Sequence, residues 1–267
     1  MFLLCDAARG RSLLMHSRRG WDDGMSILRV VQAMRQGPRR RRPYNVSIVA
    51  LRLSGAAMAR TNGFEQMSSQ QGAALRAVGI LLAAGSGSRF GGDKLLAALP
   101  DGVPVGIQSL RNLRTAIADV IVVTRPEDDA LRALLRDEGA RIEVCPRAHE
   151  GMGASLAHGI RAAKDADAWI VALGDMPRIG IGAIRAVVAA LQAGAIIAAP
   201  VYRGERGHPV GFAGALRDAL AALSGDAGAR DILRAERARM TLIDCDDPGV
   251  LADVDTRADL TRINHDR

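Results

Sequence analysis

The stretch ILLAAGSGSRFGGDK, residues 80–94, runs from an apolar segment into a loop of small residues that ends in a lysine. Lysine is rare in this chain: of its 36 basic residues, only Lys94 and Lys164 are lysines. The small residues at 83–88 allow backbone N–H groups to converge on an anion. Arg89 can hold one phosphate through two N–H groups, and Lys94 can act as a point charge on another. The loop therefore predicts a site for a triphosphate.

Two familiar phosphate-binding loops differ from this one. A Walker loop reads G-x-x-x-x-G-K-[ST], whereas the chain reads GSRFGGDKL from Gly87, with Asp93 before the lysine and no hydroxyl after it. The dinucleotide fingerprint G-x-G-x-x-G is one residue shorter than GSGSRFG, which begins at Gly85. These differences argue against a P-loop NTPase and against a dehydrogenase.

From residue 77 onward, short apolar runs alternate with helical patterns. We expect strands at 77–84, 119–125, 141–145, 168–174, 195–202 and 241–245, and helices at 106–117, 127–138, 153–164, 180–193, 214–223 and 228–237. Continuous apolar strands separated by helices are typical of parallel strands buried on both faces. The expected fold class is α/β, a three-layer α/β/α sandwich with a doubly wound, mostly parallel sheet. Its site should lie at the carboxyl ends of the strands.

Residues 1–76 differ from the rest of the chain in charge. They hold 13 arginines and four acids, a net charge of +9, which leaves −2 for residues 77–267. A short helix is possible at 25–34 and a strand at 47–53, but we expect a basic, disordered or non-native extension over 1–76. Part of it is expected to be translated upstream sequence, with the working protein starting near Met58 or Met67. Nucleic-acid binding by its arginines is disfavoured because no aromatic side chains are interleaved with them.

Three cysteines, Cys5, Cys145 and Cys245, lie far apart and form no C-x-x-C pair. This spacing indicates neither a disulfide framework nor a zinc site. No apolar run reaches the roughly 20 residues that span a bilayer, and the first residues lack the pattern of a secretory signal. We expect a cytoplasmic protein that has no membrane partner.

An acid directly follows the apolar strand in ALGDMP, residues 172–177. Because a proline stops the strand from continuing, Asp175 should point into the cleft at the end of the sheet, unless it is a turn or cap aspartate. The segment GMGASL, residues 151–156, starts a helix, and Ser155 could cap it. A lone histidine, His208, precedes a further strand.

Several motifs together resemble the nucleotidyltransferases of the molybdenum-cofactor group, the molybdenum cofactor cytidylyltransferases and guanylyltransferases. They are LLAAGSGSRFGGDK (81–94), GMGASL (151–156), ALGDMP (172–177), RGHPVGF (206–212), GDAGARDIL (225–233) and DVDTRADL (253–260). Each motif is weak alone, but all of them in this order make a specific signal. The resemblance implies a nucleotide-diphospho-sugar transferase-like fold for a nucleotidyltransferase domain over 77–267.

The resemblance also implies roles for individual residues. The nucleotide-binding set would be Leu82, Ala83, Ala84, Gly85, Ser86, Arg89, Lys94, Gly153, Ser155 and Asp175, with Gly153 and Ser155 at the base. Arg89, Lys94 and Asp175 would be catalytic, and His208 would bind the acceptor. Asp175 and Asp255 would hold Mg²⁺, with Asp253 as the alternative second ligand. The family's usual proline and glutamate after the threonine are Arg257 and Ala258 here.

The implied reaction transfers CMP from CTP to a phosphorylated acceptor, molybdenum cofactor or molybdopterin, and releases pyrophosphate. Ala84 favours CTP, because guanosine-using relatives carry L-A-G-G where this chain has L-A-A-G. A molybdoenzyme or its maturation chaperone is a possible partner. The alternatives are a related transferase that uses GTP or another phosphorylated acceptor, and a maturation factor that binds nucleotide without turnover. Two metal-type acids argue against a pure binder.

Overall fold

The computed structural model describes residues 2–6, 11–15, 75–85, 87 and 89–265. The chain divides into two compact units, Met1–Gln71 and Gly72–Arg267. Several expectations lie outside the described residues: the helix at 25–34, the strand at 47–53, the starts at Met58 and Met67, and nucleotide binding by Ser86.

In the first unit, β1 (Phe2–Asp6) and β2 (Arg11–Met15) form an antiparallel pair. Phe2 is paired with Met15 and Asp6 with Arg11. This pair was not predicted, because neither segment shows a sustained alternation of polar and apolar residues.

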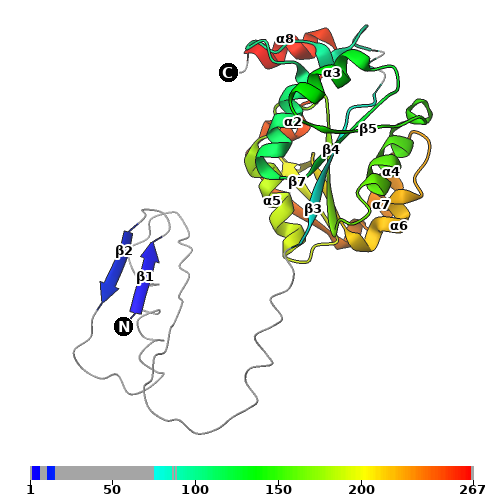
Figure 1. Cartoon of the computed structure of the whole chain (residues 1–267). Coiled ribbons are helices and arrows are strands. Elements are labelled where there is room, and N and C mark those ends of the chain that lie inside the picture. Colours follow the sequence, from blue (N-terminus) through cyan, green and yellow to red (C-terminus); the bar gives the residue numbers. More distant parts are fainter. Residues whose placement is uncertain (1, 7–10, 16–74, 86, 88, 266–267) are drawn as a thin grey trace. The chain divides into compact units, whose positions relative to one another are not determined.

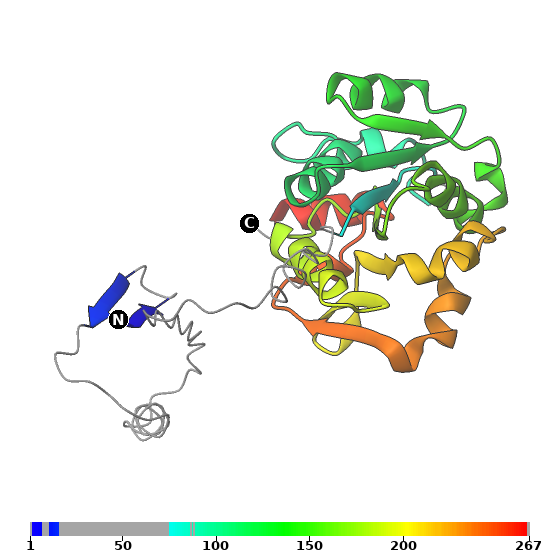
Figure 2. The ribbon, with the colours of Figure 1, turned by 60° about the horizontal axis from the view of Figure 1, so that its bottom comes forward.

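The second unit is built on a mostly parallel sheet. Its strands are β3 (Ala77–Leu82), β4 (Val120–Thr124), β5 (Arg141–Val144), β6 (Ala168–Leu173), β7 (Ile197–Tyr202), β8 (Glu205–Arg206), β9 (Val210–Ala213) and β10 (Met240–Asp244). They lie in the order β10-β7-β9-β6-β3-β4-β5, and β8 pairs with β7. In Figure 2 this order runs from the orange β10 at the bottom, past the cyan β3, to the green β5 at the top.

Helices cover both faces of this sheet, as the doubly wound fold requires. One face carries α2 (Val105–Ala116), α3 (Asp129–Asp137) and α5 (Ile181–Gln192); the other carries α4 (Met152–Ala162), α6 (Arg217–Ala221) and α7 (Arg230–Ala235). Figure 1 shows α2 and α5 on one side of the strands and α4 and α6 on the other. Short 3-10 turns are η1 (Lys94–Leu96), η2 (Ala148–Glu150), η3 (Gly214–Leu216), η4 (Arg237–Arg239) and η5 (Pro248–Leu251), and α8 (Arg257–His265) follows them.

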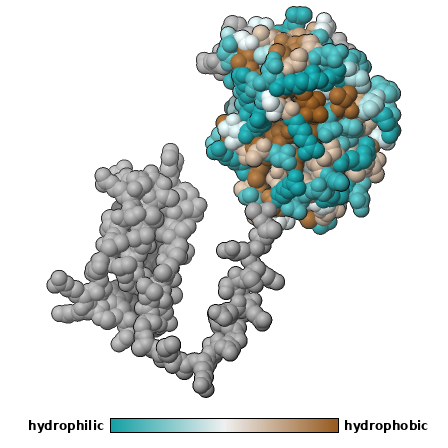
Figure 3. Space-filling model, viewed as in Figure 1, coloured by the Kyte–Doolittle hydropathy of each residue, from teal (hydrophilic) through white to brown (hydrophobic). Residues whose placement is uncertain are grey.

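Alternate residues of the central strands enter the two layers of the core. Leu81 and Val122 pack with α2 and α3, whereas Ile80 and Val123 pack on the α4 side. All four side chains are fully buried, which explains why these strands read as unbroken apolar runs. Hydrophilic residues predominate on the outer face shown in Figure 3. In the described part of the chain, no helix has the length and apolar character needed to cross a bilayer.

The fold class predicted from the sequence is confirmed, and the departures from it are local. β9 runs antiparallel to both β6 and β7, because the chain reverses after β7 without a helical crossover. The reversal uses a two-residue turn at Arg203 and Gly204, whose φ angles are 52° and 84°. The helices expected at 214–223 and 228–237 are shorter than predicted, and Gly225 and Gly228, both at positive φ, separate them. The helix α8 was not predicted.

Candidate active site

The small-residue loop leaves the carboxyl end of β3 in the middle of the sheet. Ala83 N–H donates to the Val123 carbonyl, 2.9 Å away, so the neighbouring strand fixes the direction in which the loop starts. Gly87 has φ of 59°, and a Cβ there would lie 2.9 Å from the Gly92 oxygen. Glycine is needed at this position because the loop closes on itself. The loop then enters η1, where Lys94 begins the turn and Leu95 is buried beneath it.

Asp175 lies beside this loop because β6 is the parallel neighbour of β3. Gly174 N–H donates to the Leu82 carbonyl at 2.8 Å, and a Cβ on Gly174 would lie 3.1 Å from the same oxygen. The two strand ends therefore touch through their backbones. The Asp175 carbonyl accepts from Val254 N–H at 2.9 Å, which brings the C-terminal segment to the same place.

Asp255 comes from this C-terminal segment, immediately before α8. Thr256 caps the helix: its Oγ1 accepts from Asp259 N–H at 3.2 Å, and Asp259 Oδ2 accepts from Thr256 N–H at 2.6 Å. The same Asp259 oxygen also accepts from Asp255 N–H at 3.2 Å. The cap thus holds the backbone of Asp255 in position.

The predicted cations and carboxylates meet in one cluster. Lys94 Nζ lies 2.5 Å from Asp175 Oδ2 and 3.1 Å from Asp255 Oδ1. Arg89 reaches the other oxygen of Asp255 at 2.9 Å. The Lys94 side chain is 11% exposed, whereas that of Arg89 is 79% exposed. Burial alone would lower the pKa of Lys94, but the charges and hydrogen bonds of Asp175 and Asp255 outweigh burial and raise it.

Asp253, the alternative second ligand, is placed less directly. It is exposed on the same segment, and the ion pairs of Arg89 and Lys94 go to Asp255. Partial loss of water around its carboxylate raises the pKa of Asp253, and the negative charges of Asp255 and Asp175 add to this rise. The structure therefore brings together Asp175, Asp255, Lys94 and Arg89. Asp253 lies close enough for the charges of Asp255, Asp175 and Lys94 to act on it.

The two carboxylates fit a hard divalent cation. Asp175 Oδ1 is buried and has no hydrogen-bond partner within the described part of the chain, so it is free to bind a cation. No group of three or more His, Cys, Asp or Glu side chains that could hold a metal is found among the described residues. Mg²⁺ is commonly bound through one or two carboxylates together with substrate phosphates, which is the donor set that Asp175 and Asp255 could complete.

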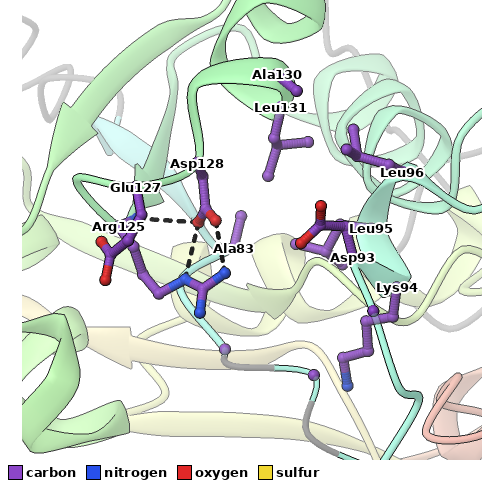
Figure 4. Close-up of a pocket in the computed structure, with 13 residues that line it drawn as sticks. Ala83, Asp93, Lys94, Leu95, Leu96, Arg125, Glu127, Asp128, Ala130 and Leu131 are labelled. Atoms are coloured by element: carbon purple, nitrogen blue, oxygen red, sulfur yellow. Dashed lines mark hydrogen bonds and ion pairs between the residues drawn. The ribbon is translucent and has the colours of Figure 1, made fainter.

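A pocket open to solvent lies between the small-residue loop, η1 and the segment that joins β4 to the start of α3. Figure 4 shows the Arg125 and Asp128 pair on one wall and Asp93 and Lys94 on the other. Arg125 Nε and a terminal nitrogen donate to the two Asp128 oxygens at 3.0 and 2.5 Å. These hydrogen bonds raise the pKa of Arg125. Arg125 was not among the predicted site residues, although its place directly after β4, at the carboxyl edge of the sheet, was a usable signal.

The predicted base-contacting residues lie on α4, on the opposite side of the sheet, and do not line this pocket. Gly153 N–H donates to the Gly225 carbonyl at 2.8 Å, and a Cβ on Gly153 would lie 2.5 Å from the Ser224 oxygen. Ser155 is 3% exposed, and its hydroxyl donates to the Gly151 carbonyl at 3.4 Å. Ser155 is thus inside the first turns of α4, and Gly151 is the cap residue.

His208 lies between β8 and β9, and its peptide bond to Pro209 is cis. Its backbone N–H donates to the Val250 carbonyl at 2.9 Å, which ties it to the segment that leads to Asp255. Its Nδ1 is shielded and lacks a hydrogen-bond partner among the described residues. Burial, helped by the charge of Arg206, lowers the pKa of His208 to about 4, although Asp175 opposes this shift. The imidazole is therefore neutral near pH 7.

A doubly wound sheet whose central loop of small residues sets two cations against two carboxylates is typical of enzymes that act on nucleoside triphosphates. The chain belongs to the family described as the MobA-like NTP transferase domain, whose model matches residues 79–240, more than half of the chain. This membership makes it a nucleotidyltransferase by family.

Two relatives match this chain along most of their own length. The chain is 34% identical to nicotine blue oxidoreductase of Paenarthrobacter nicotinovorans, over 69% of this chain and 95% of that protein. It is 31% identical to purine catabolism protein PucB of Bacillus subtilis, over 67% of this chain and 91% of that one. Among solved structures, Rv0371c of Mycobacterium tuberculosis is 27% identical with a TM-score of 0.65, covering 72% of this chain and 98% of that one. Rv0371c has also been solved in complex with manganese, with a TM-score of 0.60.

Proposed function

We propose that this protein transfers CMP from CTP to a phosphorylated acceptor, molybdenum cofactor or molybdopterin, and releases pyrophosphate. One observation carries the proposal: Lys94 lies between Asp175 and Asp255 at the carboxyl edge of the sheet, beside a loop that can receive a triphosphate. Such a group of charges suits phosphoryl chemistry, in which positioning and charge stabilisation do most of the catalysis.

Asp175 and Asp255 are the residues that would hold a divalent cation, which we take to be Mg²⁺. The manganese complex of the related Rv0371c supports a divalent ion in this family. When bound, the ion stabilises negative charge on the phosphate oxygens. The buried Oδ1 of Asp175, which has no hydrogen-bond partner among the described residues, is the oxygen best placed to be a ligand.

The remaining roles fall to the loop and its cations. The backbone from Leu82 to Ser86 would cradle the phosphates, while Arg89 and Lys94 would neutralise the charge that develops on the leaving pyrophosphate. An oxygen of the acceptor phosphate attacks the α-phosphorus in line, and the bond between the α-phosphorus and the bridging oxygen of the β-phosphate breaks. A phosphate is already ionised near pH 7, so this step needs no general base.

Substrate choice would depend on residues at either side of this centre. Gly153 and Ser155 would contact the base, with Ser155 acting from within α4, and Ala84 would favour CTP. His208, neutral and tied to the segment that carries Asp255, would bind the acceptor through a hydrogen bond and not through charge. We also infer a cytoplasmic location and a molybdoenzyme or its maturation chaperone as the recipient of the product.

The test is pyrophosphate release by the full chain with Mg²⁺ and each of CTP, GTP, ATP and UTP, with molybdenum cofactor or molybdopterin as acceptor. We expect release with CTP, and loss of release in Asp175→Asn. Release with GTP instead would overturn the base assignment. CTP binding without release for either acceptor would favour a different phosphorylated acceptor or a nucleotide-binding maturation factor.

A further inference from the structure

The cations and carboxylates of the candidate active site neutralise one another in the nucleotide-free protein. We propose that Lys94 locks the metal site: its ammonium takes the place between Asp175 and Asp255 that a divalent ion would occupy, so the ion binds tightly only together with the triphosphate. This inference rests on the proposed function, since it assumes that these two carboxylates are the ligands.

Lys94 and a divalent ion compete for the same two carboxylates. Lys94 Nζ contacts one oxygen of each carboxylate, at 2.5 and 3.1 Å. A magnesium ion would need these carboxylates at about 2.1 Å. An ammonium group has three donors and no lone pair, so it cannot join the coordination shell. Asp175 Oδ1 has no partner among the described residues, but the two oxygens of Asp255 are paired with Lys94 and Arg89. An ion held by these carboxylates would therefore be repelled by the ammonium of Lys94 until that group changes partners.

Burial determines when Lys94 can leave. Its side chain is 11% exposed, and a buried cation that loses its partners is strongly disfavoured unless another anion replaces them. A triphosphate on the neighbouring loop would be that anion, because Lys94 also lines the pocket beside the loop. On the far wall of this pocket, Asp128 is already held by Arg125.

The carboxylates are held more firmly than the lysine. The Asp255 backbone is hydrogen-bonded to Asp259, and Val254 is hydrogen-bonded to the Asp175 carbonyl. The guanidinium of Arg257 lies 5.2 Å from the ring centroid of Phe90, which joins the start of α8 to the loop. Lys94 has a flexible four-carbon stem, so it is the member of the cluster that can change partners.

Arg89 does not act as a second lock. It pairs with Asp255 as well, but its side chain is 79% exposed, and solvated ion pairs contribute little. Removing Arg89 should therefore change metal binding much less than removing Lys94. The protein thus exchanges partners when it binds substrate: Lys94 moves from carboxylate to phosphate as the ion takes the carboxylates.

Exchange of this kind makes metal and nucleotide binding reciprocal. Each ligand should raise the affinity of the protein for the other by the same factor, beyond the effect of their association in solution. The exchange also predicts that removing Lys94, although it is needed for turnover, strengthens metal binding by the nucleotide-free protein.

The experiment titrates the full chain with Mn²⁺, following the free ion by electron paramagnetic resonance, without nucleotide and then with CTP but no acceptor. The variants are Lys94→Met, with Lys94→Gln as a second form, and Lys164→Met as a control that removes the other, exposed lysine. Without nucleotide, we expect Lys94→Met to bind Mn²⁺ at least tenfold more tightly than wild type or the control. Arg89→Met should change the affinity by less than about threefold. With CTP, the advantage of Lys94→Met should disappear.

Two outcomes separate this inference from the proposed function. If neither Lys94 variant binds Mn²⁺ more tightly than the Lys164→Met control, the lock is wrong, even if CTP is turned over. Adding Asp175→Asn to Lys94→Met should abolish the gained affinity. If the double variant still binds Mn²⁺ tightly, the ion is held elsewhere and the metal assignment fails. Circular dichroism of each variant excludes loss of fold as the cause.

Discussion

Lys94 is held by two acids, yet its proposed catalytic role is toward phosphate. The lysine is placed by η1, whose first residue it is, and by Leu95, which is buried below the loop. Because its backbone is fixed and its four-carbon side chain is flexible, Lys94 can contact first the carboxylates and then the phosphates. The effect of removing Lys94 on turnover can therefore be measured separately from its effect on metal binding.

Replacing Lys94 by alanine should lower kcat/KM for CTP by about 30-fold to 1,000-fold, which corresponds to about 2 to 4 kcal/mol of transition-state stabilisation. The physical reason is the loss of a preorganised charge beside the leaving pyrophosphate. Steady-state pyrophosphate release measures it, and Lys164→Ala is the matched control. Turnover equal to that of the control would remove Lys94 from the catalytic residues.

His208 should make the stability of the protein depend on pH. Its ordinary pKa of 6.5 falls to about 4 in the folded state. As the pH drops from about 6.5 to about 4, the unfolded chain takes up a proton that the folded chain refuses, so the free energy of unfolding falls. The full loss is about 3 kcal/mol.

Denaturant unfolding at several pH values tests this dependence. His208→Gln should show a shallower fall in the free energy of unfolding across this window than the wild-type protein. Arg206 and Asp175 are the charges that act on His208, and this variant leaves them in place. A slope equal to that of the wild-type protein would contradict the assignment.

At the scale of elements, the start of α8 helps to position the charges of the candidate active site. Asp255 reaches Lys94 because the cap formed by Thr256 and Asp259 sets the backbone just before the helix. The usual family proline is replaced by Arg257, which packs over Phe90 of the loop. This substitution therefore adds a contact between the two segments that carry the charges.

Removing the cap should weaken both stability and the site. Thr256→Ala should lose about 1 kcal/mol of unfolding free energy and lower kcat/KM, because the carboxylate of Asp255 loses its support. Thr261→Ala is the matched control, since Thr261 is exposed on the same helix and donates only to the Arg257 carbonyl behind it. Thermal unfolding and steady-state assays check the two effects. A Thr256 variant that behaves like the control would show that the cap does not position Asp255.

Elements that follow from local pattern were predictable, and those that depend on distant partners were not. The apolar runs of β3, β4 and β6 required strands buried on both faces, so the central sheet could be inferred. That Asp175 and Asp255 share one site was implied only by the family resemblance, because their loops lie far apart in the sequence and no local pattern brings them together. The antiparallel direction of β9 depends on the turn at Arg203 and Gly204, which the local pattern did not reveal. The pairing of Arg125 with Asp128 depends on how the pocket wall folds, which the local pattern did not reveal either.

At the scale of the whole molecule, we propose that residues 77–267 carry the activity and that the basic segment before them is not required. All residues assigned to the site lie in the unit Gly72–Arg267. Removing residues 1–71 should leave kcat/KM within about twofold of the full chain and change the net charge from +7 to −1. Any nucleic-acid binding of the full chain, measured at low salt, should be lost with this segment. A marked loss of turnover would give the segment a role in the site.

The hydrogen bond from Val254 to the Asp175 carbonyl has a consequence for proteolysis of the protein. Asp255 lies after β10, so the second carboxylate of the cluster is carried by a segment outside the strands of the described sheet. Cleavage between Asp244 and Asp255 would remove this carboxylate and leave those strands intact. Proteolysis there should therefore silence the enzyme before it breaks up the sheet.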